Sequence, residues 1–386
     1  MKSIIFTHLK PDIFQYKAGF VLKEKDIKTI SISLLKVDRE FFKDAFDEII
    51  SLDLDNMKPI TLLKSFIKNP IKPLKFFYKV ATIRADYSIC QSAPNYLSAL
   101  FMRLFKNKFP RIYFPYDINS AGYKDIESFL PKREIWGERY CFDNCDGFMF
   151  KSGEGELNFV PKEFNLFDKR RINFSAYVLK KWCIKPAQKE KLSNLNKELH
   201  IVWAGGYPKD KGNNIVPSFS KIFKPIITQK IHLHFYLVKG TLIPEKHINE
   251  MAPTNELKSF IHIHEFVSPE KLPKELSKYD FGLNIQESSE FAKEGSVRFQ
   301  SANKVASYLE AGIPFITNEE LEIYSSMINK EGVGVVIKND FFGIKKEVKN
   351  SNYQKMVKNV IKFREKYSFE NNIQRLIDFL DSIPLN

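Results

Sequence analysis

A short stretch rich in glycine and lysine has the residue types that a phosphate site requires. Residues 205–212 read Gly-Gly-Tyr-Pro-Lys-Asp-Lys-Gly and follow directly on an apolar run that predicts a strand. Gly205 and Gly206 let the backbone approach a ligand closely, a following helix supplies N–H groups, and Lys209 and Lys211 bring positive charge to a diphosphate. The alternative is a simple turn between strand and helix with lysines in water.

A second stretch with the same potential lies near residue 304. Apolar residues recur at helical spacing over 303–311, Gly312 ends this predicted helix, and residues 313–316 form a short apolar run typical of a strand. A helix that ends at glycine and leads at once into a buried strand is half of an α/β unit. Free N–H groups in the first turn of that helix, together with Lys304, suit a phosphate.

The residues around this helix resemble the donor-site helix of GT-B glycosyltransferases, especially the large family four (group 1). The family pattern is Ser-Pro-x-Lys-x-x-Glu-Tyr-x-x-x-Gly-x-Pro, and the matching residues are Ser301, Lys304, Tyr308, Gly312 and Pro314. Two positions depart from it, because the ribose-binding Glu of the family is Ser307 here and its partner Glu falls on Phe299. Glu310, three residues further along, is the candidate substitute, and a solvated helix glutamate is the alternative.

The resemblance implies a set of donor-binding residues. Residues 205–212 are similar to the family's Gly-x-x-x-x-Lys-Gly. The family's usual arginine is Tyr207 here, so we expect Lys209 to take the role of that arginine. Residues 260–272 resemble the segment whose turn contacts the nucleobase. Arg298, in a polar loop before the helix, is a second phosphate or sugar contact or is simply exposed. The implied donor-binding residues are Gly205, Gly206, Lys209, Phe266, Val267, Arg298, Ser301, Asn303, Ser307 and Glu310.

Acceptor-binding and catalytic candidates lie in the first half of the chain. His8 and Asp12 occupy the loop after the first predicted strand, where an α/β domain places its functional residues. Tyr116 aligns with a histidine that touches the donor sugar in the family, and we assign it to the acceptor. Asp117 either acts as a base or positions the acceptor hydroxyl, or it caps the next turn. Asp117, Lys211 and Lys304 are the catalytic candidates.

The elements that position these residues indicate two Rossmann-like domains. A chain of 386 residues exceeds what one hydrophobic core normally supports, and strands alternate with helices throughout. We predict an acceptor-binding domain over 1–175, a linker over 176–198, a donor-binding domain over 199–352, and helices over 353–386 that cross back to the first domain. The fold class is therefore α/β, GT-B, with parallel sheets facing each other across a cleft.

Charge is concentrated in one part of the first domain. The net charge is +14, and residues 58–84 contain seven cationic side chains and no Asp or Glu, interleaved with aromatic and aliphatic residues. Such a stretch suits an anionic membrane surface, and the alternative is an amphipathic helix pair that packs its apolar face on the domain. No nucleic-acid-binding signature accompanies it. Asp53 and Asp55 form a D-x-D pair, which we interpret as solvated carboxylates at a strand end rather than a metal site.

These observations predict a glycosyltransferase that moves a sugar from a nucleotide diphosphate sugar to a saccharide or lipid-linked acceptor in surface polysaccharide assembly. Lys211, Lys304 and helix N-termini would neutralise the leaving diphosphate, so we expect no metal and no cofactor. The resemblance implies retention of configuration. Without a signal peptide or a spanning segment we expect a cytoplasmic protein at the inner face of the membrane. The alternatives are a sugar-nucleotide epimerase of the same fold and a non-catalytic membrane-associated scaffold.

Overall fold

The first half of the chain builds a parallel sheet. The computed structural model describes residues 1–57, 67–92, 94–166, 168–185, 190–207 and 219–384. Within these ranges seven strands form the first sheet, in the order β3-β2-β1-β4-β5-β6-β7, and every neighbouring pair is parallel. The strands are β1 (Ser3–His8), β2 (Lys28–Leu35), β3 (Glu48–Leu54), β4 (Tyr87–Gln91), β5 (Arg111–Phe114), β6 (Gly147–Phe150) and β7 (Arg170–Asn173).

Helices cover both faces of this sheet. They are α1 (Ile13–Lys23), α2 (Arg39–Phe42), α4 (Ile71–Thr82), α5 (Asn95–Leu104), α6 (Asn119–Gly122), α7 (Ile126–Phe129) and α8 (Lys132–Asn144), with short 3₁₀ turns at η1 (Glu154–Phe159) and η2 (Lys180–Trp182). Successive strand residues point to opposite faces, so Ile4 and Phe6 join the core with α1, whereas Ile5 joins the core with α5 and α8. Burial on both faces explains why β1 reads as a continuous apolar run.

The second half repeats the plan. In the described part of this half, six parallel strands take the order β10-β9-β8-β11-β12-β13. The strands are β8 (His200–Gly205), β9 (His232–Leu237), β10 (Ile261–His264), β11 (Phe281–Asn284), β12 (Phe315–Asn318) and β13 (Gly334–Ile337). The helices are α9 (Ser193–Asn196), α10 (Phe219–Thr228), α11 (Glu245–Met251), α12 (Asn255–Lys258), α13 (Leu272–Leu276), η4 (Ser296–Phe299), α14 (Asn303–Glu310), α15 (Glu322–Glu331) and α16 (Ile344–Asn350). The predicted α/β class with two parallel sheets is confirmed.

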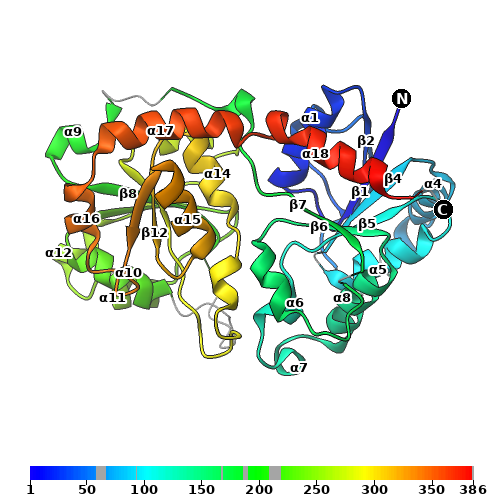
Figure 1. Ribbon diagram of the computed structural model, residues 1–386, viewed down its shortest axis with the longest axis horizontal. Helices are drawn as coiled ribbons and strands as arrows, with labels where there is room; N and C mark the ends of the chain where they lie inside the picture. The colour runs from blue at the N-terminus through cyan, green and yellow to red at the C-terminus, as the bar shows by residue number, and fades with distance from the viewer. Residues whose placement is uncertain (58–66, 93, 167, 186–189, 208–218, 385–386) are drawn as a thin grey trace.

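The two C-terminal helices connect the halves. Helix α17 (Tyr353–Lys366) lies along the second half and α18 (Phe369–Ser382) lies on the first, beside α1 (Figure 1). The rings of Phe369 and Phe14 have centroids 5.5 Å apart. Between the helices the chain pairs with the segment that leads from one sheet to the other, because Phe369 N donates to Val178 O at 2.9 Å and Val178 N donates to Tyr367 O at 3.1 Å. Two backbone segments therefore connect the halves side by side.

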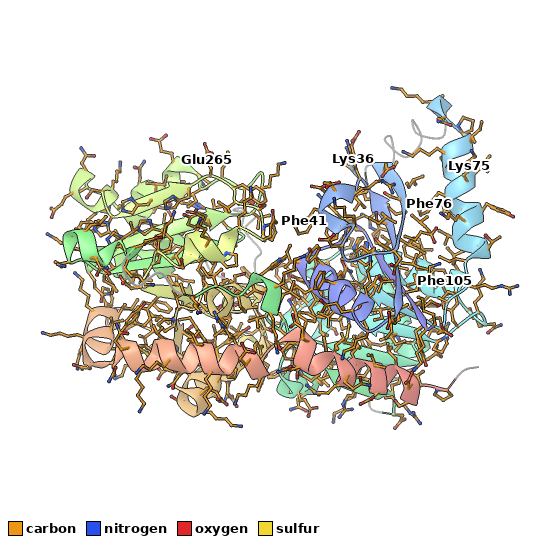
Figure 2. All side chains as sticks on the ribbon, turned by 90° about the horizontal axis from the view of Figure 1, so that it is seen from above. Lys36, Phe41, Lys75, Phe76, Phe105 and Glu265 are labelled. Carbon is orange, nitrogen blue, oxygen red and sulfur yellow. The ribbon has the colours of Figure 1, made fainter. Side chains whose placement is uncertain are left out.

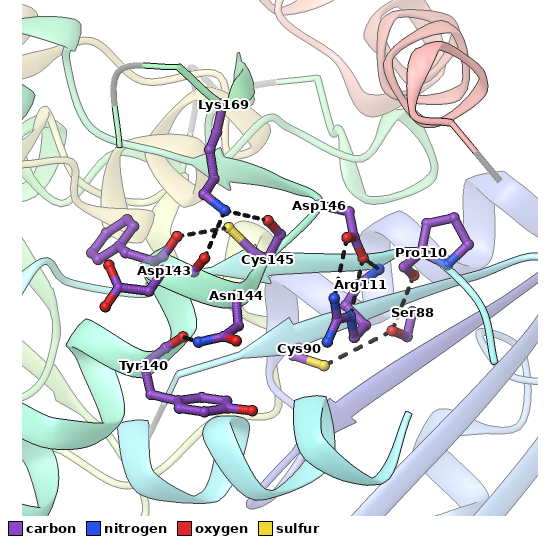
Figure 3. Close-up of polar contacts among 11 residues, drawn as sticks. Ser88, Cys90, Pro110, Arg111, Tyr140, Asp143, Asn144, Cys145, Asp146 and Lys169 are labelled. Carbon is purple, nitrogen blue, oxygen red and sulfur yellow. Dashed lines mark hydrogen bonds and ion pairs between the residues drawn. The ribbon is translucent and has the colours of Figure 1, made fainter. Parts of the chain in front are cut away.

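Charged pairs fix strand ends in the first sheet. Arg111, at the start of β5, donates through Nε and Nη2 to the two carboxylate oxygens of Asp146, at 3.0 and 3.1 Å, and its backbone N–H also donates to Asp146 (Figure 3). Lys169 donates to the carbonyl oxygens of Asp143 and Cys145 at 2.9 and 2.8 Å. These contacts hold β5, β6 and the approach to β7 in register.

Histidines form a hydrogen-bonded ladder across β8, β9 and β10. His200 and His234 are joined at 2.9 Å, His234 and His264 at 3.0 Å, and His232 and His262 at 2.9 Å. Burial lowers the pKa of His200 to about 4 and lowers the pKa of His234, His262 and His264 as well. The side chains of His200, His234, His262 and His264 are therefore neutral near pH 7. In the described ranges no helix is long and apolar enough to cross a membrane.

Candidate functional site

The end of β8 and the start of α14 bring together Gly205, a predicted donor-binding residue, and Lys304, a predicted catalytic residue. The Lys304 ammonium lies 3.3 Å from the centroid of the Trp203 ring, and its Cε lies 3.6 Å from where a Cβ on Gly205 would stand. Loss of water around the ammonium lowers the pKa of Lys304 to about 7. Within the described part of the chain no carboxylate pairs with it. A lysine and a glycine at the start of a helix can bind an anion, because the ammonium and the N–H groups of the first turn both donate hydrogen bonds.

Tyr308 explains the rest of the helix motif. Its hydroxyl accepts from Ala204 N at 3.1 Å and donates to Leu283 O at 2.9 Å, so it ties α14 to β8 and β11. Gly282 lies under the ring, and a Cβ at that position would come within 2.2 Å of Tyr308 Cγ. The tyrosine of the motif therefore sets the position of α14, and through it the position of Lys304.

Polar side chains from both halves of the chain lie together at the start of α14. Asn303 Nδ2 donates to the hydroxyl of Tyr116, at the end of β5. Lys151, directly after β6, lies 3.7 Å from the centroid of the Tyr116 ring and 3.5 Å from Asp117 Oδ1. Burial raises the pKa of Tyr116 well above its ordinary value, so the phenol stays protonated. Asp117 itself is 76% exposed and open to a ligand.

Lys151, which lies beside Tyr116 and Asp117, was not among the predicted site residues. Its sequence signal was its position immediately after a buried strand, since the carboxyl ends of parallel strands converge on the cleft of an α/β domain. Glu138, in contrast, has a structural role: its carboxylate accepts from Asn119 N at 2.7 Å and from Ser120 N at 2.9 Å, and burial raises its pKa to about 7. It holds the turn that follows Asp117.

Asp12 lies near Tyr116 and Lys151, whereas His8 is buried and not accessible to a ligand. Asp12 accepts from Gln15 N at 3.1 Å as the N-cap of α1, and its other oxygen accepts from Gln91 Nε2 at 3.2 Å. Desolvation raises its pKa. His8 is buried, its Nε2 lies 2.9 Å from Ser31 Oγ, and burial lowers its pKa to about 3. The assignment of His8 to the acceptor is therefore corrected, because its ring is enclosed in the sheet.

Glu310 is a second correction. Its carboxylate is 1% exposed, lies 2.6 Å from Lys17 Nζ of α1, and accepts from Leu179 N at 2.8 Å. It occupies the last turn of α14, at the opposite end from Lys304. A carboxylate that binds these partners cannot reach a ribose at the first turn of α14. Its role is to connect the domain of the second sheet to α1.

The remaining donor candidates are dispersed around α14. Ser301 Oγ lies 3.3 Å from the Tyr324 hydroxyl, and Arg298 pairs with Glu322 at 2.5 Å at the surface. Phe266 is exposed after β10, while Val267 packs against the core beneath it. Ser307 is partly exposed in the middle of the helix. Gly206 accepts from Trp203 Nε1 at 3.2 Å. Lys209 and Lys211 lie outside the described residues.

The loop before α14 docks on the first half of the chain. Lys293 Nζ donates to Ser120 O at 2.7 Å and to Phe159 O at 2.8 Å, and Gly153 N donates to Phe299 O at 2.9 Å. The Phe299 ring covers Gly155 so closely that a Cβ there would come within 2.3 Å of the ring. The position that carries a glutamate in the family is thus an apolar contact between the two halves.

Known proteins share the fold of this chain. Residues 236–378 match the family described as Glucosyltransferase 3-like, C-terminal domain. Sucrose-phosphate synthase from Thermosynechococcus elongatus superposes with a TM-score of 0.66 at 10% identity, covering 99% of this chain and 98% of that one. The chain has the GT-B fold. A search of curated proteins by sequence finds no match.

Two further GT-B structures contain nucleotides. Anabaena HepE in complex with UDP-glucose superposes with a TM-score of 0.64 at 10% identity, covering 99% of this chain and 100% of that one. S. aureus MnaA in a co-structure with UDP superposes with a TM-score of 0.56 at 13% identity, covering 100% of this chain and 99% of that one. Lys304 and Gly205 belong to the half built on the second sheet, and Tyr116, Asp117 and Lys151 follow strands of the first sheet.

Proposed function

We propose that this GT-B chain is a glycosyltransferase that moves a sugar from a nucleotide diphosphate sugar to an acceptor. The observation that carries the proposal is Lys304. Its ammonium is desolvated over Trp203 at the start of α14, beside Gly205, and no carboxylate of the described chain pairs with it. The negative charge of a diphosphate would pair with the lysine ammonium, and its oxygens would accept hydrogen bonds from the free N–H groups of the helix.

The donor is proposed to be a uridine diphosphate sugar. The support is the UDP-glucose in the HepE complex and the UDP in the MnaA co-structure. Phe266 and Val267, after β10, are the proposed contacts of the base, and Ser301, Asn303 and Ser307 those of the sugar and ribose. Lys209 and Lys211 remain proposed diphosphate contacts. With Ser307 and Phe299 in place of the family's glutamates, ribose recognition must rely on hydroxyl and backbone groups.

In the proposed reaction the bond between the anomeric carbon and the diphosphate oxygen breaks while an acceptor oxygen bonds to that carbon. Negative charge then develops on the diphosphate, where Lys304 and the α14 N–H groups stabilise it, so we propose that no metal is needed. Asp117 is the proposed group that accepts or orients the acceptor proton. Lys151, 3.5 Å from its carboxylate, holds it in place. Retention of configuration follows the family resemblance.

The acceptor is proposed to be a saccharide or lipid-linked saccharide of surface polysaccharide assembly. The basic and aromatic stretch 58–84 is the proposed contact with an anionic membrane at its cytoplasmic face. Of this stretch the structure describes residues 67–84, where α4 exposes several apolar side chains next to its lysines. Tyr116, Asp12 and Lys151 are the proposed acceptor contacts.

The test is a thermal-shift panel of UDP, GDP, dTDP, CMP and ADP. A ligand that binds only the folded state at one hundred times its Kd stabilises the protein by about 2.7 kcal/mol. We expect a shift with UDP that Lys304→Ala removes. The matched control is Lys191→Met, because Lys191 is another desolvated lysine that packs on the same domain, with its pKa lowered to about 8 and its Nζ donating to Tyr279 O.

Lys191→Met is expected to lower the melting temperature and to keep the UDP shift. If no nucleotide shifts the wild type, the enzyme proposal fails and the chain is better described as a scaffold on a GT-B frame. If a nucleotide binds but Lys304→Ala binds it equally well, the assignment of the site is wrong.

A further inference from the structure

One loop of the second half of the chain reaches the first half. It joins β11 to α14, and its residues Phe291, Ala292 and Lys293 contact α6 and the residues that follow it. Ala292 and Tyr123 form an antiparallel bridge, which the bond from Lys124 N to Phe291 O, at 3.0 Å, extends. In Figure 1 this loop, drawn in yellow, meets α6 and α7 at the lower edge of the molecule. At the upper edge α17 leads into α18, and Figure 2 shows these two helices end to end across both halves. The halves are therefore joined at two separate places.

Lys293 contacts α6 through its backbone and through its side chain. Its backbone N–H donates to Gly122 O at 2.8 Å, and its ammonium donates to Ser120 O at 2.7 Å. The ammonium also donates to Phe159 O at 2.8 Å, at the end of η1. A helix leaves the carbonyl groups of its last turn without partners inside the helix, and α6 is a single turn. Lys293 therefore supplies, from the other half, the partners of two carbonyl groups of α6.

The first half holds the other end of this turn. The Glu138 carboxylate accepts from the first two N–H groups of α6. Asp117 lies two residues before α6, and on its other side Tyr116 N donates to Ser92 Oγ at 2.9 Å. The backbone of Asp117 thus lies between a fixed N–H group and a helical turn that Glu138 binds at its start and Lys293 binds at its end.

We propose that Lys293 is a positioning residue for Asp117. By binding the carbonyl end of α6 it holds the turn that carries the carboxylate, so Asp117 takes its place in the reaction only while the two halves are joined. The inference rests on the proposed function, in which Asp117 accepts or orients the acceptor proton. The loop of Lys293 continues into α14 and Lys304, so one continuous segment connects the proposed diphosphate site to Asp117.

The first test is hydrogen exchange of the whole chain, read by mass spectrometry over residues 117–124. We expect Lys293→Met to accelerate exchange there by about tenfold or more, the effect of losing a hydrogen bond to a charged group. Lys293→Arg is expected to keep exchange slow, because a guanidinium also donates to several carbonyl groups.

Lys169→Met is the matched control for this substitution. The Lys169 ammonium also donates to two carbonyl oxygens, but both belong to its own half. Lys169 precedes β7, whereas Asp117 follows β5, so the two residues lie at opposite ends of the parallel strands. Lys169→Met is expected to leave exchange over residues 117–124 unchanged.

The second test is turnover, measured as the release of UDP and glucose from UDP-glucose with water as the acceptor. Lys293→Met is expected to lower kcat about tenfold and to leave the Kd for UDP unchanged, because it removes a contact on the acceptor side of the reaction. In an Asp117→Asn background the same substitution is expected to change kcat by less than about twofold, since the carboxylate that Lys293 positions is absent. Lys293→Arg is expected to recover most of the wild-type kcat, and Lys169→Met to leave kcat unchanged.

Three results would overturn the inference: unchanged exchange over residues 117–124 in Lys293→Met, an unchanged kcat, or the same loss of kcat with and without the Asp117 carboxylate. If Lys293→Met does not fold, Phe291→Ser replaces it. This variant loosens the same loop by removing the contact with the Phe129 ring, whose centroid lies 5.1 Å from that of Phe291, and the same non-additive loss is expected. Failure of the proposed function is recognised separately, as the absence of UDP binding or of turnover in the wild type.

Discussion

Protonation of Lys304 is expected to be coupled to donor binding. The free site lowers the pKa of Lys304 to about 7 because the ammonium is desolvated beside Trp203. A bound diphosphate favours the charged form, so the pKa in the complex is higher than in the free protein. Binding therefore takes up a proton wherever the pH lies between the two pKa values.

The magnitude follows from this shift. At pH 7 about half of the free lysine is charged, and at pH 8 about one tenth, so binding at pH 8 takes up about 0.9 proton. Above pH 7 the affinity is expected to fall about tenfold for each pH unit, or about 1.4 kcal/mol, until the pH reaches the pKa of the complex. Below pH 7 the affinity becomes independent of pH, because the lysine is already charged.

The assay is calorimetry with UDP-glucose, whose diphosphate has no proton that titrates near neutral pH. Titrations at pH 6, 7 and 8 in two buffers of different ionisation enthalpy give the number of protons taken up directly. Lys304→Arg is the matched variant, because a guanidinium stays charged throughout this range. It is expected to bind with an affinity that does not change between pH 6 and 8 and without proton uptake.

Two results would refute this reasoning. One is wild-type binding at pH 8 without proton uptake, which would mean that the lysine is already charged or does not meet the diphosphate. The other is the same proton uptake in Lys304→Arg as in the wild type, which would place the titrating group elsewhere.

Three further predictions concern other parts of the molecule. Glu310→Gln is expected to destabilise the protein by about 3–5 kcal/mol in urea unfolding, because it leaves Lys17 buried without its carboxylate; adding Lys17→Met should recover part of the loss, and simple additivity would contradict a direct pair. Stability is expected to fall as the pH drops below about 6.5, by about 1.4 kcal/mol per buried histidine at pH 5.5, because folding keeps His200 and His234 neutral while the unfolded chain protonates them. Unfolding free energies measured at pH 7.5 and 5.5 check this, and equal values would exclude it. Lys151→Met is expected to lower acceptor-dependent turnover by about tenfold or more without changing the Kd for UDP-glucose, and a changed Kd would place the residue at the donor instead.

Predictions from sequence succeeded where short-range chemistry decides the structure. Gly205 and Lys304 were predicted at ends of neighbouring elements, and the structure places Lys304 Cε 3.6 Å from where a Cβ on Gly205 would stand; their roles in donor binding stay predictions. The reason is general: in a parallel sheet the carboxyl ends of the strands and the starts of the following helices meet at one edge. Any lysine or glycine at such a position is brought to the cleft by the fold itself.

They failed where a residue's partner is distant in the chain. Glu310 has an ordinary helical context, and nothing near it in sequence shows that Lys17, 293 positions away, will occupy its carboxylate. His8 ends a strand as a functional residue would, but its neighbour in β2 offers a hydroxyl that keeps the ring inside the sheet. Lys151 was not predicted because its contacts are with Tyr116 and Asp117, which follow another strand, β5.

The sequence by itself determined the elements, because periodicity and end signals are local. The helix predicted over 303–311 agrees with α14 (Asn303–Glu310), the apolar run over 313–316 leads into β12 (Phe315–Asn318), and the α/β class is confirmed. Only the tertiary structure decided which side chains face ligand and which face each other. The orientation of these side chains depends on how α18 and the loop around Phe299 hold the two sheets relative to one another. Contacts between the two halves join residues far apart in the chain, so no local sequence pattern predicts them.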